Sequence, residues 1–129
     1  MEPCVVYKKF VMVGDLNAAG TLYGGTMMSW VDEAASIYAA EVLGPGVSFV
    51  TLKISEVLFK HPAVLGDLLT FNANLCRVGR TSLDVSVSVH NRQREIVSCD
   101  VRFVTVDHQH RRPVPHCLPP GTAPAPGGQ

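Results

Sequence analysis

Hydrophobic and polar residues alternate along the second half of the chain. Leu or Val occupies every second position within residues 82–90, and Asp or Ser occupies the positions between them. Residues 68–78 alternate more loosely, residues 47–59 are mixed but largely apolar, and residues 96–106 follow a polar turn. Period-two alternation with one polar side is typical of antiparallel strands with one covered face. We therefore predict four consecutive strands in these ranges, preceded by a strand over residues 4–13, which are rich in β-branched and aromatic side chains.

A long apolar segment separates the first predicted strand from the other four. After the pair Gly24-Gly25, residues 26–43 follow a helical period, and Gly and Pro at 44–46 give a stop signal. At about 1.5 Å per residue such a helix is roughly 27 Å long, enough to cross a small sheet. A helix that is apolar on most sides is normally buried. The pattern predicts an α+β fold in which one sheet wraps around one buried helix.

The composition narrows the class of protein. A chain of 129 residues with 47% apolar residues is expected to form one domain, over residues 1–110. Residues 111–129 are dominated by Pro and Gly and are expected to be a disordered tail. Eleven basic and eleven acidic residues leave no formal net charge, which argues against non-specific binding to nucleic acid. Only 17% of the residues are charged, which indicates that another subunit covers part of the surface.

The cysteines and the apolar runs indicate the cellular compartment of the protein. The four cysteines are widely spaced and form no Cys-x-x-Cys pair, and the N-terminus shows no secretory signal. We expect free thiols in a reducing compartment, and hence a cytoplasmic protein. Charged residues interrupt the apolar runs before they reach about 18 residues, so we predict neither a membrane-spanning helix nor a membrane partner.

One carboxylate stands inside the apolar helix. Asp32 lies within the run that begins at Gly24-Gly25, and a buried carboxylate is costly unless it is hydrogen-bonded, paired or chemically active. The glycine pair offers bare N–H groups at the positive end of the helix dipole. Together they form a candidate active site. The alternatives are a structural carboxylate that braces an interface, and a glycine pair that only makes a tight turn from loop to helix.

Three segments of the chain resemble the signature of the hotdog-fold acyl-CoA thioesterases. They are Asn17-Ala-Ala-Gly20-Thr-Leu-Tyr-Gly24-Gly25 with Asp32 seven residues later, Phe59-Lys60-His61-Pro62-Ala63-Val64-Leu65-Gly66-Asp67, and Val78-Gly79-Arg80-Thr81-Ser82. The resemblance covers residues 6–107. It implies a hotdog fold, in which one sheet wraps a central helix and two subunits pair to build active sites at their interface. At least a homodimer is expected, and a tetramer or hexamer remains open.

The resemblance implies a hydrolytic reaction that releases a carboxylic acid and free coenzyme A, without a metal or a redox cofactor. Asp32 is then the general base or the nucleophile, and the backbone N–H groups of Gly24 and Gly25 stabilise the oxyanion. Asn17 orients the water or the substrate carbonyl, across the interface from the partner subunit's Asp32. From the residue alone, an Asx-turn is the alternative for Asn17.

The resemblance also implies which residues bind the substrate. Tyr23 is expected to pack against the acyl or pantetheine chain, and Thr51 to line the same groove. The segment from Gly79 to Ser82, which includes Arg80 and Thr81, is expected to meet coenzyme A, with Arg80 pairing with a phosphate. A solvated hairpin with a surface arginine is the alternative for this segment.

Two other functions compete with hydrolysis. A hotdog domain that binds acyl-CoA without chemistry, as a sensor or a partner-recruiting module, would keep the groove. A dehydratase would need a His and a matching acid, and His61 lacks such an acid on the helix, so we interpret His61 as a structural or loop residue. The spacing of His108, His110, His116 and Cys117 matches no standard zinc module, and no metal site is predicted.

Overall fold

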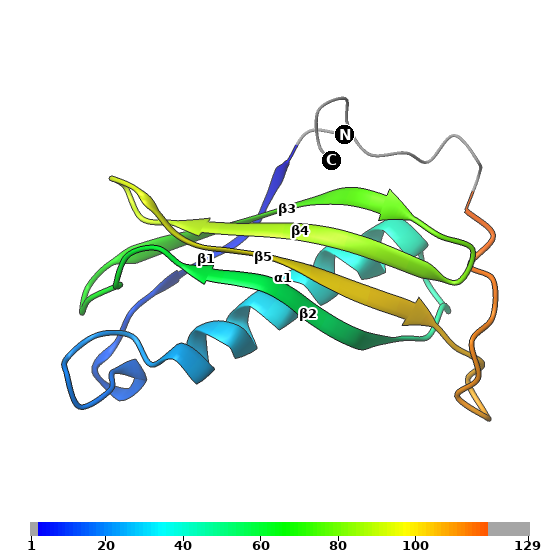
Figure 1. The fold of residues 1–129 in the computed structure, drawn as a ribbon, viewed down its shortest axis with the longest axis horizontal. Helices are drawn as coiled ribbons and strands as arrows, with labels where there is room; N and C mark the ends of the chain where they lie inside the picture. Colours follow the sequence, from blue (N-terminus) through cyan, green and yellow to red (C-terminus); the bar gives the residue numbers. More distant parts are fainter. Residues whose placement is uncertain (1–2, 119–129) are drawn as a thin grey trace.

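The computed structural model describes residues 3–118 and contains one long helix and one sheet (Figure 1). The elements follow one another in the order β1 (Cys4–Phe10), the 3₁₀ turn η1 (Val13–Asp15), α1 (Gly24–Leu43), β2 (Phe49–Phe59), β3 (Leu68–Val78), β4 (Ser82–His90) and β5 (Glu95–Thr105). This arrangement confirms the predicted α+β fold. The predicted strands 68–78 and 82–90 coincide with β3 and β4, and the helix begins two residues before the predicted start, at the glycine pair.

The five strands form a single antiparallel sheet in the order β1-β3-β4-β5-β2. The helix connects β1 to β2, the two edge strands, and lies along one face of the sheet between them (Figure 1). The pairing of β2 with β5 shifts register twice, between Thr51 and Lys53 and between Ser55 and Leu58. Glu56, within the second shift, has a φ of 55°. Such bulges bend an edge strand and change which side chains face inward.

The core lies between the sheet and α1. Alternate residues of the three central strands are buried, as the period-two pattern predicts, and they face the buried stripe of the helix. The middle of this stripe contains Ala34, Ala35 and Ala39, whose small side chains allow the helix axis to approach the sheet. The Tyr38 hydroxyl accepts a hydrogen bond from the Leu75 N–H at 3.1 Å, which fixes the helix against β3.

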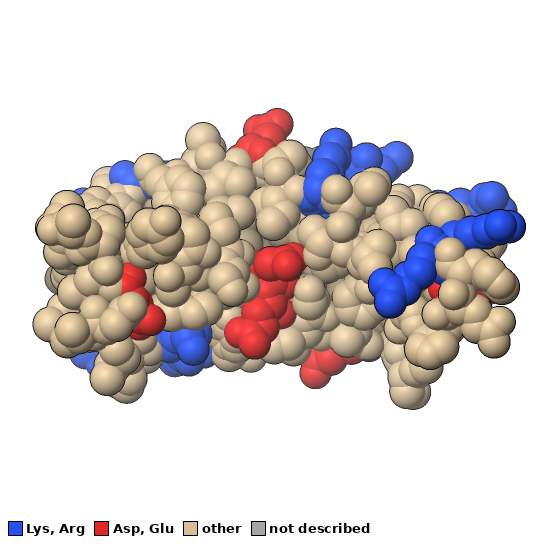
Figure 2. All heavy atoms as spheres, turned by 90° about the horizontal axis from the view of Figure 1, so that it is seen from below, with Lys and Arg blue, Asp and Glu red and all other residues tan. Residues whose placement is uncertain are grey.

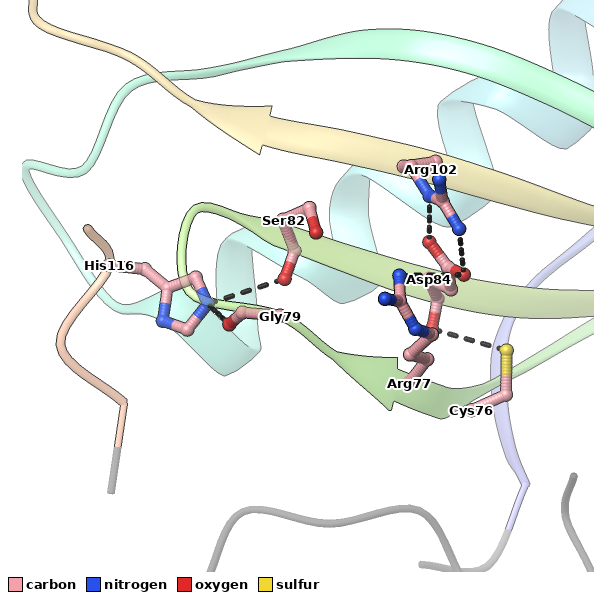
Figure 3. Close-up of polar contacts among 7 residues, drawn as sticks. All are labelled: Cys76, Arg77, Gly79, Ser82, Asp84, Arg102 and His116. Carbon is pink, nitrogen blue, oxygen red and sulfur yellow. Dashed lines mark hydrogen bonds and ion pairs between the residues drawn. The ribbon is translucent and has the colours of Figure 1, made fainter. Parts of the chain in front are cut away.

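The outer face of the sheet is polar. Cross-strand pairs link the central strands, and the strongest is Arg102, which donates two hydrogen bonds to Asp84 at 2.7 and 2.9 Å (Figure 3). Ser86 donates to Asp100 at 2.7 Å. The sheet is therefore covered by α1 on one face only. No helix among residues 3–118 is long and apolar enough to cross a membrane.

The structure describes residues 111–118 of the segment that the sequence analysis expects to be disordered. Residues 113–118 run beside the sheet, where Val106 and Pro113 form an antiparallel bridge and the Val114 N–H donates to the Thr105 carbonyl at 2.9 Å. Backbone hydrogen bonds of this kind do not require an apolar sequence. The rest of the predicted tail, residues 119–129, lies outside the described residues.

Candidate functional site

Asp32 and Thr51 form a hydrogen-bonded pair between the helix and the edge strand β2. The Thr51 hydroxyl donates to Oδ1 of Asp32 at 2.8 Å. Asp32 is only partly buried, on the side of α1 that faces β2, so its carboxylate is not sealed in the core. Within residues 3–118, Oδ2 receives no hydrogen bond. One carboxylate oxygen is thus fixed in place, while the other is open to a ligand or a water molecule.

A buried thiol lies close to this pair. Cys99 on β5 is 4% exposed. Burial raises the pKa of the Cys99 thiol to about 12, and the charges of Asp100 and Asp32 act in the same direction. A thiol with this pKa stays protonated at neutral pH and is a poor nucleophile. Cys99 is therefore not a candidate nucleophile, and sequence reasoning did not place it near Asp32.

The start of α1 is open to an anion. Tyr23 is the N-cap residue and provides no capping side-chain hydrogen bond, and the first turn contains no acidic residue. The first N–H groups of the helix, beginning at Gly24 and Gly25, point out of its positive end. This is the arrangement expected of a helix start that binds a negatively charged oxygen.

The backbone at the glycine pair does not itself require glycine. Neither Gly24 nor Gly25 has a positive φ. A Cβ added at Gly24 would lie 3.8 Å from the Phe59 ring, an ordinary contact, whereas one added at Gly25 would lie 3.0 Å from the Tyr23 ring, a tight contact. Neither backbone conformation nor lack of space therefore explains Gly24, and its role in binding an oxyanion stays a prediction.

Asn17 organises the loop that leads into the helix. Its Oδ1 accepts hydrogen bonds from the N–H groups of Ala19 and Thr21 at 2.9 and 3.0 Å, and its Nδ2 donates to the Thr21 hydroxyl at 3.0 Å. This is the Asx-turn alternative for Asn17. Within one chain Asn17 contacts neither Asp32 nor Thr51, so a role in orienting substrate stays a prediction.

An apolar cavity of about 350 Å³ opens beside the start of α1. Its walls include Leu22, Gly24, Met27, Phe59 and Ala63. Sequence reasoning included Phe59 and Ala63 in a family motif without assigning them to a binding site. The signal in the sequence that could have indicated it is Phe59, an aromatic residue two positions before the His61-Pro62 pair.

His61 lies at the rim of this cavity. Its ring Nδ1 is 3.1 Å from Nη1 of Arg94. Its neighbour is thus a cation rather than the carboxylate that a dehydratase needs. Among residues 3–118, no three His, Cys, Asp or Glu side chains lie close enough together to bind a metal ion.

The β3–β4 turn, from Gly79 to Ser82, lies at the other end of the molecule. Figure 1 places it near the end of α1, opposite the start of the helix. The Gly79 N–H donates to the Ser82 carbonyl at 2.9 Å, and Figure 3 shows His116 against this turn. Seen from below in Figure 2, basic side chains are prominent at this end, and others lie at the opposite end. The exposed arginines at the end with the β3–β4 turn include Arg80, Arg111 and Arg112.

The predicted site residues therefore fall into three groups within one chain. Asp32 and Thr51 form one group, the helix start with Tyr23 and Asn17 forms the second, and the β3–β4 turn forms the third. Asp32 is eight residues along the helix from Gly24, which at 1.5 Å per residue is roughly 12 Å along the axis. No single chain brings all three groups together.

Comparisons with known proteins agree on the family. The thioesterase superfamily model matches residues 19–98. An uncharacterized acyl-CoA thioester hydrolase of Zymomonas mobilis is 32% identical over 116 residues, which cover 85% of this chain and 75% of that protein. The acyl-CoA thioester hydrolase YciA of Escherichia coli is 31% identical over 85 residues, and the chain spans 63% of its length.

Among solved structures, the hexameric thioesterase y2039 from Yersinia pestis superposes with a TM-score of 0.80 at 26% identity, covering 91% of this chain and 96% of that one. The family match, the relatives and the superposition rest on the same core of helix and sheet. The chain belongs to the thioesterase superfamily, has the hotdog fold, and is homologous to acyl-CoA thioester hydrolases.

Proposed function

We propose that the protein is an acyl-CoA thioesterase that hydrolyses acyl-CoA to a carboxylic acid and free coenzyme A. The observation that carries the proposal is the Asp32–Thr51 pair, in which Thr51 holds one carboxylate oxygen at 2.8 Å and the other oxygen is open. The homologous acyl-CoA thioester hydrolases give the reaction class. A reducing, cytoplasmic location suits the four unbridged cysteines.

A complete site needs a second copy of the chain. The open start of α1 lies roughly 12 Å along the axis from the Asp32 of the same helix, too far for both to contact one thioester carbonyl. The edge strand β2, whose Thr51 contacts Asp32, exposes apolar side chains, with Leu52 59% and Leu58 54% exposed. We propose that β2 faces the partner subunit, which brings the partner's helix start to Asp32. Hexameric relatives such as y2039 are consistent with assembly from such pairs.

In the proposed reaction Asp32 acts at the thioester carbonyl. As a general base it accepts a proton from a water molecule, whose oxygen attacks the carbonyl carbon, and as a nucleophile it attacks the carbon itself. The developing oxyanion is stabilised by the N–H groups of Gly24 and Gly25, where one such donor typically lowers the barrier by about 3 kcal/mol. Collapse of the intermediate breaks the C–S bond, and the thiolate leaves as the coenzyme A thiol after taking up a proton. On the general-base route Asp32 returns that proton and the carboxylic acid is formed directly. On the nucleophilic route an acyl–Asp32 anhydride is left, which a water molecule then hydrolyses to the carboxylic acid and free Asp32.

The remaining two groups bind the substrate. The apolar cavity beside Gly24 and Met27 takes an apolar part of the substrate, the acyl or pantetheine chain. At the other end of the molecule, the exposed Arg80 of the β3–β4 turn suits a phosphate of coenzyme A, because its guanidinium donates in a planar fork. A solved acyl-CoA hydrolase from Staphylococcus aureus, 26% identical with a TM-score of 0.78, is in complex with coenzyme A.

The test is release of free thiol from a panel of acyl-CoAs, with the wild type beside Asp32→Asn. We expect the variant to keep the melting temperature and to lose turnover by roughly 100-fold or more, as for loss of a general base. Glu33→Gln is the matched control, because Glu33 is the next residue on α1, is exposed and contacts Tyr7 instead of Thr51.

Two results would contradict the proposal. If Asp32→Asn retained most of the activity, Asp32 would have no part in the mechanism. If the wild type released thiol from no acyl-CoA yet bound acyl-CoA tightly in calorimetry, the protein would be a sensor or recruiting module.

A further inference from the structure

Residues 113–118, which we call the strap, run beside the β3–β4 turn and are hydrogen-bonded to it. The strap is joined to the end of β5 by the Val114 N–H, which donates to the Thr105 carbonyl at 2.9 Å, and by the Thr105 hydroxyl, which donates to the Val114 carbonyl. Its last residue, Leu118, packs partly against the core. The strap is therefore fixed at both ends.

The His116 ring lies between these two anchors and contacts the turn (Figure 3). Its Nδ1 accepts a hydrogen bond from the Leu118 N–H at 3.2 Å, so the ring proton of the neutral imidazole is on Nε2. Nε2 therefore donates to the Gly79 carbonyl at 2.6 Å and, more weakly, to the Ser82 carbonyl at 3.3 Å. The backbone N–H of His116 donates to the Arg80 carbonyl at 3.3 Å.

Every carbonyl of the turn is thereby oriented. His116 binds those of Gly79, Arg80 and Ser82, and Thr105 binds that of Thr81 through its N–H at 2.8 Å. In a trans peptide the N–H points away from the carbonyl of the preceding residue. The N–H groups of Arg80 and Thr81 are consequently directed away from the strap, and within residues 3–118 neither donates a hydrogen bond.

Two adjacent N–H groups that have no partner within residues 3–118, next to the exposed Arg80 side chain, can bind an anion. The free energy of binding depends on how rigidly these donors are held before the ligand arrives, because ordering a loop upon binding reduces affinity. His116 supplies three of the contacts that hold them.

We propose that His116 is a positioning residue for the phosphate end of coenzyme A. It does not touch the ligand. It fixes the Gly79 and Arg80 carbonyls so that the N–H groups of Arg80 and Thr81, together with the Arg80 side chain, meet the phosphate. This inference rests on the proposed function, since it assumes that the turn meets coenzyme A.

The test compares ligands with and without the nucleotide. Dissociation constants for coenzyme A and for pantetheine are measured by calorimetry for the wild type, His116→Ala and His116→Gln. His116→Ala should raise the dissociation constant of coenzyme A by roughly five- to tenfold, the change expected when one or two hydrogen bonds are lost. The dissociation constant of pantetheine should stay unchanged. His116→Gln should restore most of the affinity, because its amide can donate toward the Gly79 carbonyl.

His110→Ala is the matched control. His110 is an exposed histidine just before the strap, and its ring contacts Asp107 rather than the turn, so its loss should leave both dissociation constants unchanged. The melting temperature of each variant is measured in parallel.

Three results would overturn the inference. His116→Ala could weaken the binding of coenzyme A and of pantetheine equally, or it could leave the affinity for coenzyme A unchanged. The third result is a wild-type protein that does not bind coenzyme A. Thiol release from acyl-CoA, measured separately, tests the proposed function. A protein that binds coenzyme A through His116 but hydrolyses nothing would refute the enzyme and retain the positioning role.

Discussion

Asp32 and Thr51 show how one hydroxyl can prepare a carboxylate for chemistry. The Thr51 hydroxyl holds Oδ1 at 2.8 Å, which restricts rotation of the carboxylate and gives Oδ2 a fixed direction. A base that is held in its productive orientation does not lose rotational freedom in the transition state. At this scale the proposed site depends on a pair of residues rather than on Asp32 alone.

Removal of the Thr51 hydroxyl should lower turnover. Thr51→Val keeps the β-branched shape that suits a strand and deletes the donor. We expect kcat to fall by roughly tenfold, the effect of losing one hydrogen bond to a charged group, with little change in KM. Steady-state kinetics would show this, and Thr51→Ser should recover most of kcat. A full loss in Thr51→Ser as well would indicate that the methyl group matters rather than the hydroxyl.

The thiols should differ sharply in reactivity. Cys4 and Cys117 are exposed, whereas burial raises the pKa of Cys99 to about 12. A maleimide or disulfide reagent at neutral pH should modify Cys4 and Cys117 quickly and Cys99 only after unfolding, as peptide mass spectrometry would show. Fast labelling of Cys99 in the folded protein would contradict its burial.

The same pKa gives a dependence of stability on pH. Above the ordinary thiol pKa of 9.0 the unfolded chain releases the Cys99 proton, while the folded chain retains it until about 12. The free energy of unfolding should therefore fall as the pH rises through this interval, and Cys99→Ala should reduce that fall.

Among the elements, α1 and the central strands could be predicted from the sequence, because their patterns are local. The alternation in β3 and β4 and the helical period of α1 follow directly from which side chains are buried. The Asp32–Thr51 contact could not be predicted in this way. It depends on β2, where Thr51 pairs with Phe103 while Lys53 pairs with Arg102, and such a shift changes which face a side chain occupies.

The contacts of the strap, by contrast, could not be predicted from a local pattern. Its Pro-rich sequence has no periodic pattern, so composition predicts disorder for residues 111–129. The hydrogen bonds of residues 113–118 are made by the backbone, the His116 ring, the Cys117 thiol and the Thr105 hydroxyl, and hydrophobic patterning carries no signal for any of these. For Asn17 the sequence predicts only the local structure, because the Asx-turn follows from its residue type and its place in a loop.

The start of α1 offers a test that separates stability from activity. Gly24→Ala has room for its methyl group, 3.8 Å from the Phe59 ring, and Ala favours helix more than Gly does. We expect an unchanged or higher melting temperature, together with a kcat reduced by roughly tenfold or more, because the methyl group stands where the oxyanion approaches the backbone.

Gly14→Ala is the control for Gly24→Ala. Gly14 lies in η1, and a Cβ there would meet no atom within 4 Å. Full activity in Gly24→Ala would remove the glycine pair from the oxyanion site.

At the scale of the whole molecule, β2 is the edge on which the proposed function depends. Its unpaired backbone groups and its exposed apolar side chains make it the natural contact for a second copy. The other edge strand, β1, carries Lys8 and Lys9, whereas β2 carries Lys53 and Glu56 along a longer strand.

A charge placed on β2 should separate the subunits. Leu52→Glu puts a carboxylate at a position that is 59% exposed in the single chain and apolar in the wild type. We expect light scattering after size-exclusion chromatography to show monomers, and thiol release to be lost although Asp32 is intact. Val5→Glu, on β1 and 55% exposed, is the control and should not yield monomers. An active Leu52→Glu monomer would refute a site shared between two chains.

The spacing between the start of α1 and Asp32 has a consequence for inheritance. If each active centre takes its glycine pair from one chain and its aspartate from the other, two different defective alleles can compensate for each other. Random pairing of Asp32→Asn chains with Gly24→Ala chains gives mixed dimers, and each contains one centre with both residues intact and one with neither. Roughly a quarter of all centres would then regain wild-type function, a case of interallelic complementation that two lesions at position 32 could never produce.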